Sequence, residues 1–131
     1  DREPLPTWTK GRLTLLGDAA HPMLPHLGQG ANQTMEDGMA LAIILSSIEN
    51  SAVPAALAAY DNLRRERVAE IVLGARQNGL RVDSMSEYAD LNKRDTELAA
   101  HAEFRKQLYA YDVVPDAEAT AAALIKNCDF A

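Results

Sequence analysis

The chain has 131 residues, of which 47% are hydrophobic and 24% are charged, with a formal net charge of −6. This composition is typical of one globular domain with enough apolar side chains for a core, and it excludes intrinsic disorder. The basic residues form no stripe interleaved with aromatic residues, and no apolar run approaches the roughly 20 residues that span a bilayer. We therefore expect no nucleic-acid or membrane partner. The single cysteine, Cys128, cannot form an internal disulfide and favours a cytoplasmic location.

A short apolar run follows a polar N-terminal segment that contains two prolines, Pro4 and Pro6. Residues 13–16 read Leu-Thr-Leu-Leu, which predicts a short buried strand that Gly17 ends. A single strand is not stable without hydrogen-bonding partners. We expect these partners from a region outside the chain or from a second copy of it.

A loop rich in glycine and proline follows the predicted strand. Asp18 stands at the carboxyl end of the strand, where ligands of open α/β sheets collect. Gly28 and Gly30 allow a flat ligand to approach the backbone closely. A helix predicted to begin near Asn32 would point its first N–H groups and its dipole at this loop.

The remaining sequence is predominantly helical. Apolar residues recur at helical spacing over residues 32–48, 55–78, 95–108 and 115–126, whereas residues 81–91 fit either a short helix or a loop. The first of these helices is apolar nearly all round, which is typical of a buried helix. Gly79 is expected to cap the second helix. The fold class is therefore mostly α, with one short strand and four or so helices, in a single piece divided into residues 1–48 and 49–131.

The segment GRLTLLGDAAHPMLPHLGQGANQTMEDG, residues 11–38, resembles the flavin-binding GD motif of the class A FAD-dependent aromatic monooxygenases. This family includes the salicylate and hydroxybenzoate hydroxylases. Tyr60 with residues 64–67 is similar to the family's Y-x3-R-x2-R helix, and the YAYDVV run at residues 109–114 is similar to the family's C-terminal end. The resemblance implies an α/β FAD-binding domain of the glutathione-reductase-like kind. The family's G-x-G-x-x-G unit, which binds ADP, is not found in this sequence. We expect the chain to be a C-terminal fragment that, in isolation, retains no FAD and is inactive.

The resemblance also implies roles for individual residues. The counterpart of Asp18 accepts a hydrogen bond from a ribityl hydroxyl of FAD, although in isolation an aspartate here would be read as a turn or capping residue. Pro25 aligns with the proline beside the reacting edge of the flavin and is the expected catalytic-site residue. The expected cofactor-binding residues are Gly17, Asp18, Leu27, Gly28, Gln29, Gly30, Ala31 and Asn32.

Several other polar residues admit two readings. The spacing of His21 and His26 matches no metal site, so no metal is expected. We expect His21 to fix the turn through a backbone hydrogen bond and leave open whether His26 faces the substrate. The basic cluster Arg64, Arg65 and Arg67 could contact a cofactor phosphate, but a solvated or ion-paired helix face is favoured. Three aromatic residues are expected to be packing residues with polar tips: Trp8, Tyr109 and Tyr111.

The function implied is that of an oxidoreductase, an FAD-dependent, NAD(P)H-using monooxygenase that hydroxylates a small phenolic acid such as salicylate or hydroxybenzoate. The alternative is a catalytically inactive helical fragment that acts only as an oligomerising or interaction module. The predicted strand and a second apolar helix face would be sticky if uncovered, so a homodimer or higher oligomer is expected. The contact would use residues 13–16 and one of two helix faces, formed by Met35, Met39 and Ile43 or by Leu41, Leu45 and Ile48.

Overall fold

A computed structural model describes residues 2–46, 48–84 and 91–128 of the chain. A two-stranded sheet and two 3-10 helices precede the first α-helix: β1 (Thr9–Lys10), β2 (Leu13–Thr14), η1 (Gly17–Ala19) and η2 (Pro25–Leu27). The rest is helical: α1 (Gly30–Leu45), η3 (Asn50–Ala52), α2 (Val53–Ser84), α3 (Leu91–Ala110) and α4 (Val113–Cys128). The predicted fold class, mostly α with one small strand region and four helices, is confirmed.

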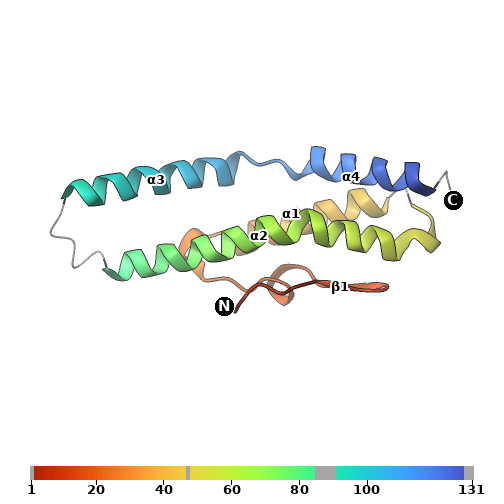
Figure 1. Ribbon diagram of the computed structural model, residues 1–131, viewed down its shortest axis with the longest axis horizontal. Helices are drawn as coiled ribbons and strands as arrows, with labels where there is room; N and C mark the ends of the chain where they lie inside the picture. The colour runs from red at the N-terminus through yellow and green to blue at the C-terminus, as the bar shows by residue number, and fades with distance from the viewer. Residues whose placement is uncertain (1, 47, 85–90, 129–131) are drawn as a thin grey trace.

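The helices and the hairpin lie in three layers (Figure 1). The long helix α2 runs beside α1, and α4 packs against both of them. The N-terminal hairpin and its following loop lie on the side of α2 opposite α3 and α4. The prediction that the first helix is buried nearly all round was wrong, because only Gln33, Asp37, Ala40 and Ile44 of α1 are buried. Its other apolar side chains include exposed ones, Met35, Met39 and Leu45.

The apolar run at residues 13–16 does not form a buried strand. Within it only Leu13–Thr14 forms a strand, which pairs antiparallel with Thr9–Lys10 of the same chain. Gly11 has a φ of +61°, a conformation that glycine adopts without strain and that reverses the chain between the two strands. Leu13 and Leu16 are 62% and 41% exposed, so both the predicted burial and the predicted external partner were wrong. The partner strand is β1, which the turn at Gly11 brings beside β2 and which the apolar pattern did not indicate.

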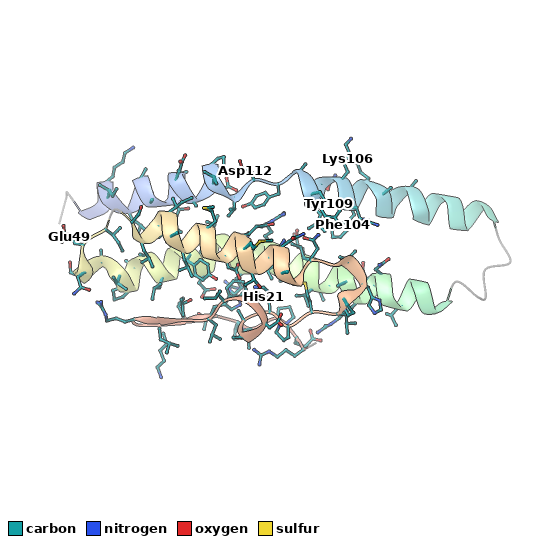
Figure 2. All side chains as sticks on the ribbon, turned by 180° about the vertical axis from the view of Figure 1, so that it is seen from behind. His21, Glu49, Phe104, Lys106, Tyr109 and Asp112 are labelled. Atoms are coloured by element: carbon teal, nitrogen blue, oxygen red, sulfur yellow. The ribbon has the colours of Figure 1, made fainter. Side chains whose placement is uncertain are left out.

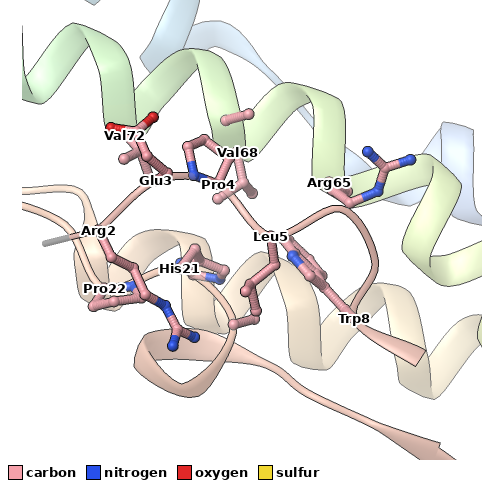
Figure 3. A pocket seen from close by; sticks show the side chains of 12 residues that line it. Arg2, Glu3, Pro4, Leu5, Trp8, His21, Pro22, Arg65, Val68 and Val72 are labelled. Atoms are coloured by element: carbon pink, nitrogen blue, oxygen red, sulfur yellow. The ribbon is translucent and has the colours of Figure 1, made fainter. Parts of the chain in front are cut away.

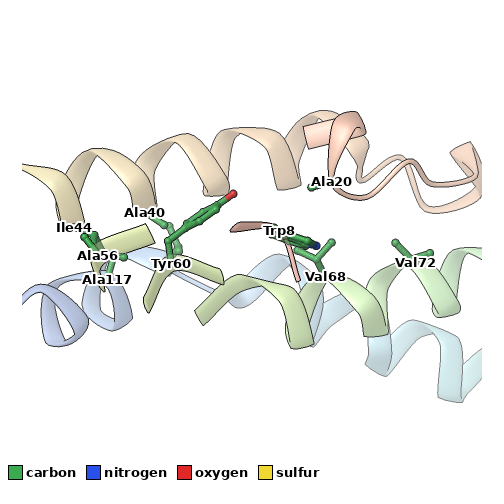
Figure 4. Packing of buried hydrophobic residues seen from close by; sticks show 10 residues of the cluster. Trp8, Ala20, Ala40, Ile44, Ala56, Tyr60, Val68, Val72 and Ala117 are labelled. Atoms are coloured by element: carbon green, nitrogen blue, oxygen red, sulfur yellow. The ribbon is translucent and has the colours of Figure 1, made fainter. Parts of the chain in front are cut away.

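The main core lies where the hairpin, α1, α2 and α4 meet (Figure 4). Trp8 and Tyr60 fill it with aromatic volume, and small side chains allow the helices to approach closely: Ala40, Ala56, Ala117 and Val68. The packing role predicted for Trp8 is confirmed, since its ring is buried between those of His21 and Tyr60. A second cluster joins η2 to α2 and α3 and consists of Leu27, Ile71, Ala75 and Leu108.

Helix α2 continues past the glycine that was predicted to end it. Gly79 lies inside α2, and a Cβ atom added there would come within 2.6 Å of the His26 Cδ2 atom. The missing side chain therefore makes room for a ring from η2 instead of capping the helix. Part of the ambiguous segment, Arg81–Ser84, also belongs to α2, whereas residues 85–90 lie outside the described residues.

Among the described residues, no helix combines the length and the hydropathy that a membrane span requires. Within residues 2–46, 48–84 and 91–128, no group of three or more His, Cys, Asp or Glu side chains is arranged to hold a metal ion.

Candidate functional site

The turn after the hairpin places a carboxylate beside the first turn of α1. Gly17 is buried with a φ of +57°, and a Cβ atom added to it would lie 2.9 Å from the Thr34 Oγ1 atom of α1. The next residue, Asp18, is exposed and makes no hydrogen bond with any described residue. Its Oδ1 atom lies 4.0 Å from where a Cβ atom of Gly30 would be, so Asp18 faces the start of α1.

The N-terminus of α1 is open to an incoming acceptor. Gly28 ends η2 with a φ of +64°, and Gln29 then occupies the N-cap position without a side-chain capping bond. The first N–H groups of a helix have no acceptor within the helix, and the helix dipole makes this end partly positive. Gly30, the first residue of α1, presents bare backbone next to Asp18.

The structure brings the sequence-predicted site residues together around η1, η2 and the first turn of α1. Exposed or half-exposed are Asp18, Pro25, Gly28, Gly30, Ala31 and Asn32. The side chains of Leu27 and Gln29 are buried, Leu27 within the second core cluster, so these two residues can offer a ligand only their backbone. Gly17 is buried as well and acts on the site by shaping the turn.

Behind this surface lies a polar network centred on Asp37 of α1, which is itself fully buried. Its Oδ2 atom accepts hydrogen bonds from the Gly17 N–H at 3.0 Å and from His21 Nε2 at 2.6 Å. Its Oδ1 atom accepts from Arg64 Nε at 3.0 Å. Both carboxylate oxygens are therefore used, and three elements of the chain meet on one side chain.

Arg64 of α2 connects the network to a second and a third residue of α1. Its NH1 group donates to Glu36 at 2.7 Å, and its NH2 group donates to Gln33 at 2.8 Å. Gln33 in turn donates to Glu36 at 2.9 Å. Arg64 is ion-paired, which agrees with one part of the expected solvated or ion-paired helix face. Its side chain is completely buried, however, and not solvated.

Burial alone would raise the pKa of Asp37, because it disfavours a charged carboxylate. The hydrogen bonds from His21, Gly17 and Arg64 outweigh burial and hold the pKa below its ordinary value. His21 Nε2 therefore donates to an ionised carboxylate. Since the folded pKa is lowered, the stabilisation from Asp37 is complete above its ordinary pKa and is lost as pH falls through the lowered value.

The two histidines of the loop take different positions. The predicted backbone hydrogen bond that fixes the turn is present, since the His21 N–H donates to the Gly17 carbonyl at 2.9 Å. The imidazole of His21, which was not assigned a partner from the sequence, is buried between the hairpin loop and the helices and bonds Asp37 (Figure 2). The ring of His26 lies against Gly79 of α2, and its carbonyl accepts from Asn78 at 2.8 Å.

A cation–π contact joins the network to the C-terminal helices. The guanidinium carbon of Arg67 lies 3.6 Å from the centroid of the Tyr111 ring, and its NH2 group donates to the Leu108 carbonyl at 3.3 Å. Arg67 Nε also donates to Glu36 at 3.5 Å. Tyr111 donates its hydroxyl proton to Asp116, which fits the predicted packing residue with a polar tip, and burial followed by this bond raises its pKa. Tyr109 is 55% exposed, so the packing role predicted for it was wrong.

Two hollows border these residues. An enclosed one of ≈ 10 Å³, lined by Trp8, His21 and Val72 among others, has room for about one water molecule and is too small for an organic ligand (Figure 3). A shallow one of ≈ 270 Å³ lies on the α1 side and is lined by Gln29, Asn32, Met35, Glu36, Leu108, Tyr109 and Tyr111.

Neither hollow was predicted, and the network was missed as well. A sequence signal for the network exists. Tyr60 and Arg64 are four residues apart on one helix face, and the adjacent acidic residues Glu36 and Asp37 could have paired with a buried arginine. The site as a whole consists of the exposed carboxylate of Asp18 and the uncapped N-terminus of α1. The hydrogen bonds of Asp37 connect the turn that carries Asp18 to α1.

Comparison with known proteins identifies a family that this chain matches. The model of the FAD binding domain family matches residues 3–75. The FAD-dependent monooxygenase notI of Aspergillus sp. (strain MF297-2) is 49% identical over 87 residues, which cover 63% of this chain and 20% of that protein. The 3-amino-4-hydroxybenzoate 2-monooxygenase PtmB3 of Streptomyces platensis is 47% identical over 79 residues, covering 60% of this chain and 20% of that protein.

A solved structure agrees with these relatives. A salicylate hydroxylase in complex with substrate superposes with a TM-score of 0.77 and 36% sequence identity, over 90% of this chain and 29% of that chain. The fold thus matches part of a salicylate hydroxylase. The chain belongs to the FAD binding domain family, and it spans about 20% of the length of the curated monooxygenases it matches.

Proposed function

We propose that the chain forms the riboflavin-facing, C-terminal portion of an FAD-dependent, NAD(P)H-using monooxygenase that hydroxylates a small phenolic acid. One observation carries the proposal. In a member of the FAD binding domain family, an exposed carboxylate without a partner among the described residues, Asp18, stands beside the uncapped N-terminus of α1. A carboxylate is suited to hold a polyol chain, and a helix N-terminus is suited to hold a negatively charged ring edge.

The residues of the site divide the work of holding FAD. Asp18 would accept a hydrogen bond from a ribityl hydroxyl. The backbone N–H groups from Gly28 to Asn32 would face the pyrimidine end of the flavin, where negative charge collects on reduction. Pro25, rigid and exposed on η2, would shape the wall beside the reacting edge. When bound, the flavin supplies the oxidation chemistry, while the protein supplies placement, electrostatics and exclusion of water.

The substrate class rests on the relatives. One is named for 3-amino-4-hydroxybenzoate, and another, from Pseudomonas fluorescens, for 6-hydroxynicotinate. Both compounds are single rings that carry a carboxylate and a hydroxyl group. A small phenolic acid is therefore the proposed substrate, with NAD(P)H as the reductant and a cytoplasmic location.

Replacing Asp18 with alanine tests the proposed role of this site. In the gene product that contains these residues, Asp18→Ala should raise the FAD dissociation constant by about tenfold to a hundredfold, because one charge-assisted hydrogen bond contributes about 1.5–3 kcal/mol. FAD fluorescence on titration measures this change. Asp112→Ala is the matched control, since Asp112 is an exposed aspartate between α3 and α4. Equal affinities of the two variants would show that Asp18 is only a turn residue.

We also propose that the 131-residue chain by itself associates into a homodimer or higher oligomer, which is the part of the alternative function that an observation favours. Met35 and Met39 of α1 are 66% and 49% exposed, and Leu13 and Leu16 of the hairpin region are exposed as well. Such apolar surface is typical of an interface. Light scattering at micromolar concentration should give at least twice the monomer mass, and Met35→Lys with Met39→Lys should shift it toward the monomer. A monomer before substitution would contradict this proposal.

A further inference from the structure

A single buried side chain holds the turn that carries Asp18 on both flanks. Asp37 Oδ2 accepts from the N–H of Gly17, the residue before Asp18, and from the ring of His21, three residues after Asp18. The backbone bond from the His21 N–H to the Gly17 carbonyl closes the same loop. Asp18 thus projects from a turn whose two ends are tied to one carboxylate oxygen.

The other oxygen of Asp37 sets where this turn lies relative to the helices. It accepts from Arg64 Nε, and the guanidinium also donates to Glu36 and Gln33. Arg64 therefore fixes α1 against α2 through three residues of α1. Since Asp37 belongs to α1, the same carboxylate places the turn at the start of that helix, where Asp18 lies next to Gly30.

We propose that Asp37 is a positioning residue for the cofactor contact of Asp18, acting through the Gly17 N–H and the His21 ring. The inference rests on the proposed function and extends it to a residue that no ligand touches. The backbone of Gly17 is held in the left-handed region at φ +57°, where a neighbouring restraint is needed to keep one conformation. Removing that restraint releases the Asp18 carboxylate from the edge of α1.

Asp37→Asn is the test variant, because a carboxamide keeps the size of the side chain and loses one acceptor. Its nitrogen cannot accept from either Gly17 or Arg64. We expect the FAD dissociation constant of the gene product to rise by about tenfold. In the Asp18→Ala background the same substitution should raise it by less than about twofold, because residues that act through one contact are not additive.

Asp61→Asn is the matched control. Asp61 is a buried aspartate of α2 that accepts from Thr7 at 2.6 Å, from the Trp8 N–H at 3.1 Å and from Arg65 at 3.0 Å. The Asp61→Asn substitution destabilises a different part of the chain. Its effect on FAD affinity should therefore be the same in the unsubstituted background and in the Asp18→Ala background. Urea unfolding of the FAD-free proteins establishes that the variants are folded.

If Asp37→Asn does not fold, His21→Gln replaces it, since this change loosens one flank of the turn and leaves the Asp37–Arg64 pair in place. Additive effects of the position-37 or position-21 variant with Asp18→Ala would overturn the positioning role alone. FAD affinity that falls in Asp18→Ala but not in either of these variants would overturn it too. Absence of FAD binding by the unsubstituted protein would instead overturn the proposed function, and this inference with it.

Discussion

Replacing Arg64 with alanine should lower the free energy of unfolding by about 3–5 kcal/mol, because it leaves buried carboxylate charge without its partner. The guanidinium is completely buried and donates to Asp37, Glu36 and Gln33. Neither Asp37 nor Gln33 can turn to water when Arg64 is removed, since both are fully buried. The measurement is urea denaturation followed by circular dichroism.

Arg105→Ala is the control for the loss of an arginine as such. Arg105 is exposed on α3, and its contacts are with the exposed Tyr109. Its removal should change stability by less than about 1 kcal/mol. If Arg64→Ala were no more harmful than Arg105→Ala, the buried network would not be a stabilising feature of the fold.

Gly17→Ala should have the second large effect, for two separable reasons. A non-glycine residue in the left-handed region costs about 1–3 kcal/mol. In addition, the new methyl group would meet Thr34 Oγ1 at 2.9 Å and Thr34 Cγ2 at 3.1 Å, so the Thr34 side chain or the turn would have to shift. We expect a loss of stability, and in the gene product a loss of FAD affinity, because Asp18 moves with the turn.

Gly11→Ala separates these two reasons. Gly11 has nearly the same backbone conformation, with a φ of +61°, but a methyl group there would have no neighbour within 4 Å. Gly11→Ala therefore measures the conformational penalty alone, and its effect on stability should be smaller than that of Gly17→Ala. Adding Thr34→Ala to Gly17→Ala removes the clash and should recover part of the difference. No recovery would mean that the contact with Thr34 is unimportant.

The sequence predicts the helical part of this fold well, because the spacing of apolar residues that indicates a helix is local in the chain. The four helices lie where apolar residues recur at helical intervals, although each is longer than its pattern or shifted along the chain. The ends of the helices were harder to predict. Gly79 is a residue type typical of a helix C-cap, but it lies inside α2 and contacts the ring of His26. A distant ring decides the role of that glycine, and no local pattern contains it.

The hairpin and the network show what local patterns omit. Leu13 and Leu16 were read as buried because they are apolar, but the turn at Gly11 pairs their segment with a neighbour that leaves both exposed. Arg64 was read as surface because arginines are seldom buried. Its burial depends on acceptors that stand 27 to 31 residues earlier in the chain. Asp18, by contrast, was found from a motif, and the structure places it beside the helix N-terminus that the motif implies.

The most direct test of the account is the flavin content of the purified gene product that contains these residues. After free FAD is removed, the visible spectrum should show bound flavin by its absorbance near ~450 nm, a property of the cofactor. We predict equimolar FAD and, with NAD(P)H and a small phenolic acid, formation of a hydroxylated product. A protein that stays colourless and does not change the fluorescence of added FAD would contradict the central claim that the Gly17–Asn32 segment holds a flavin.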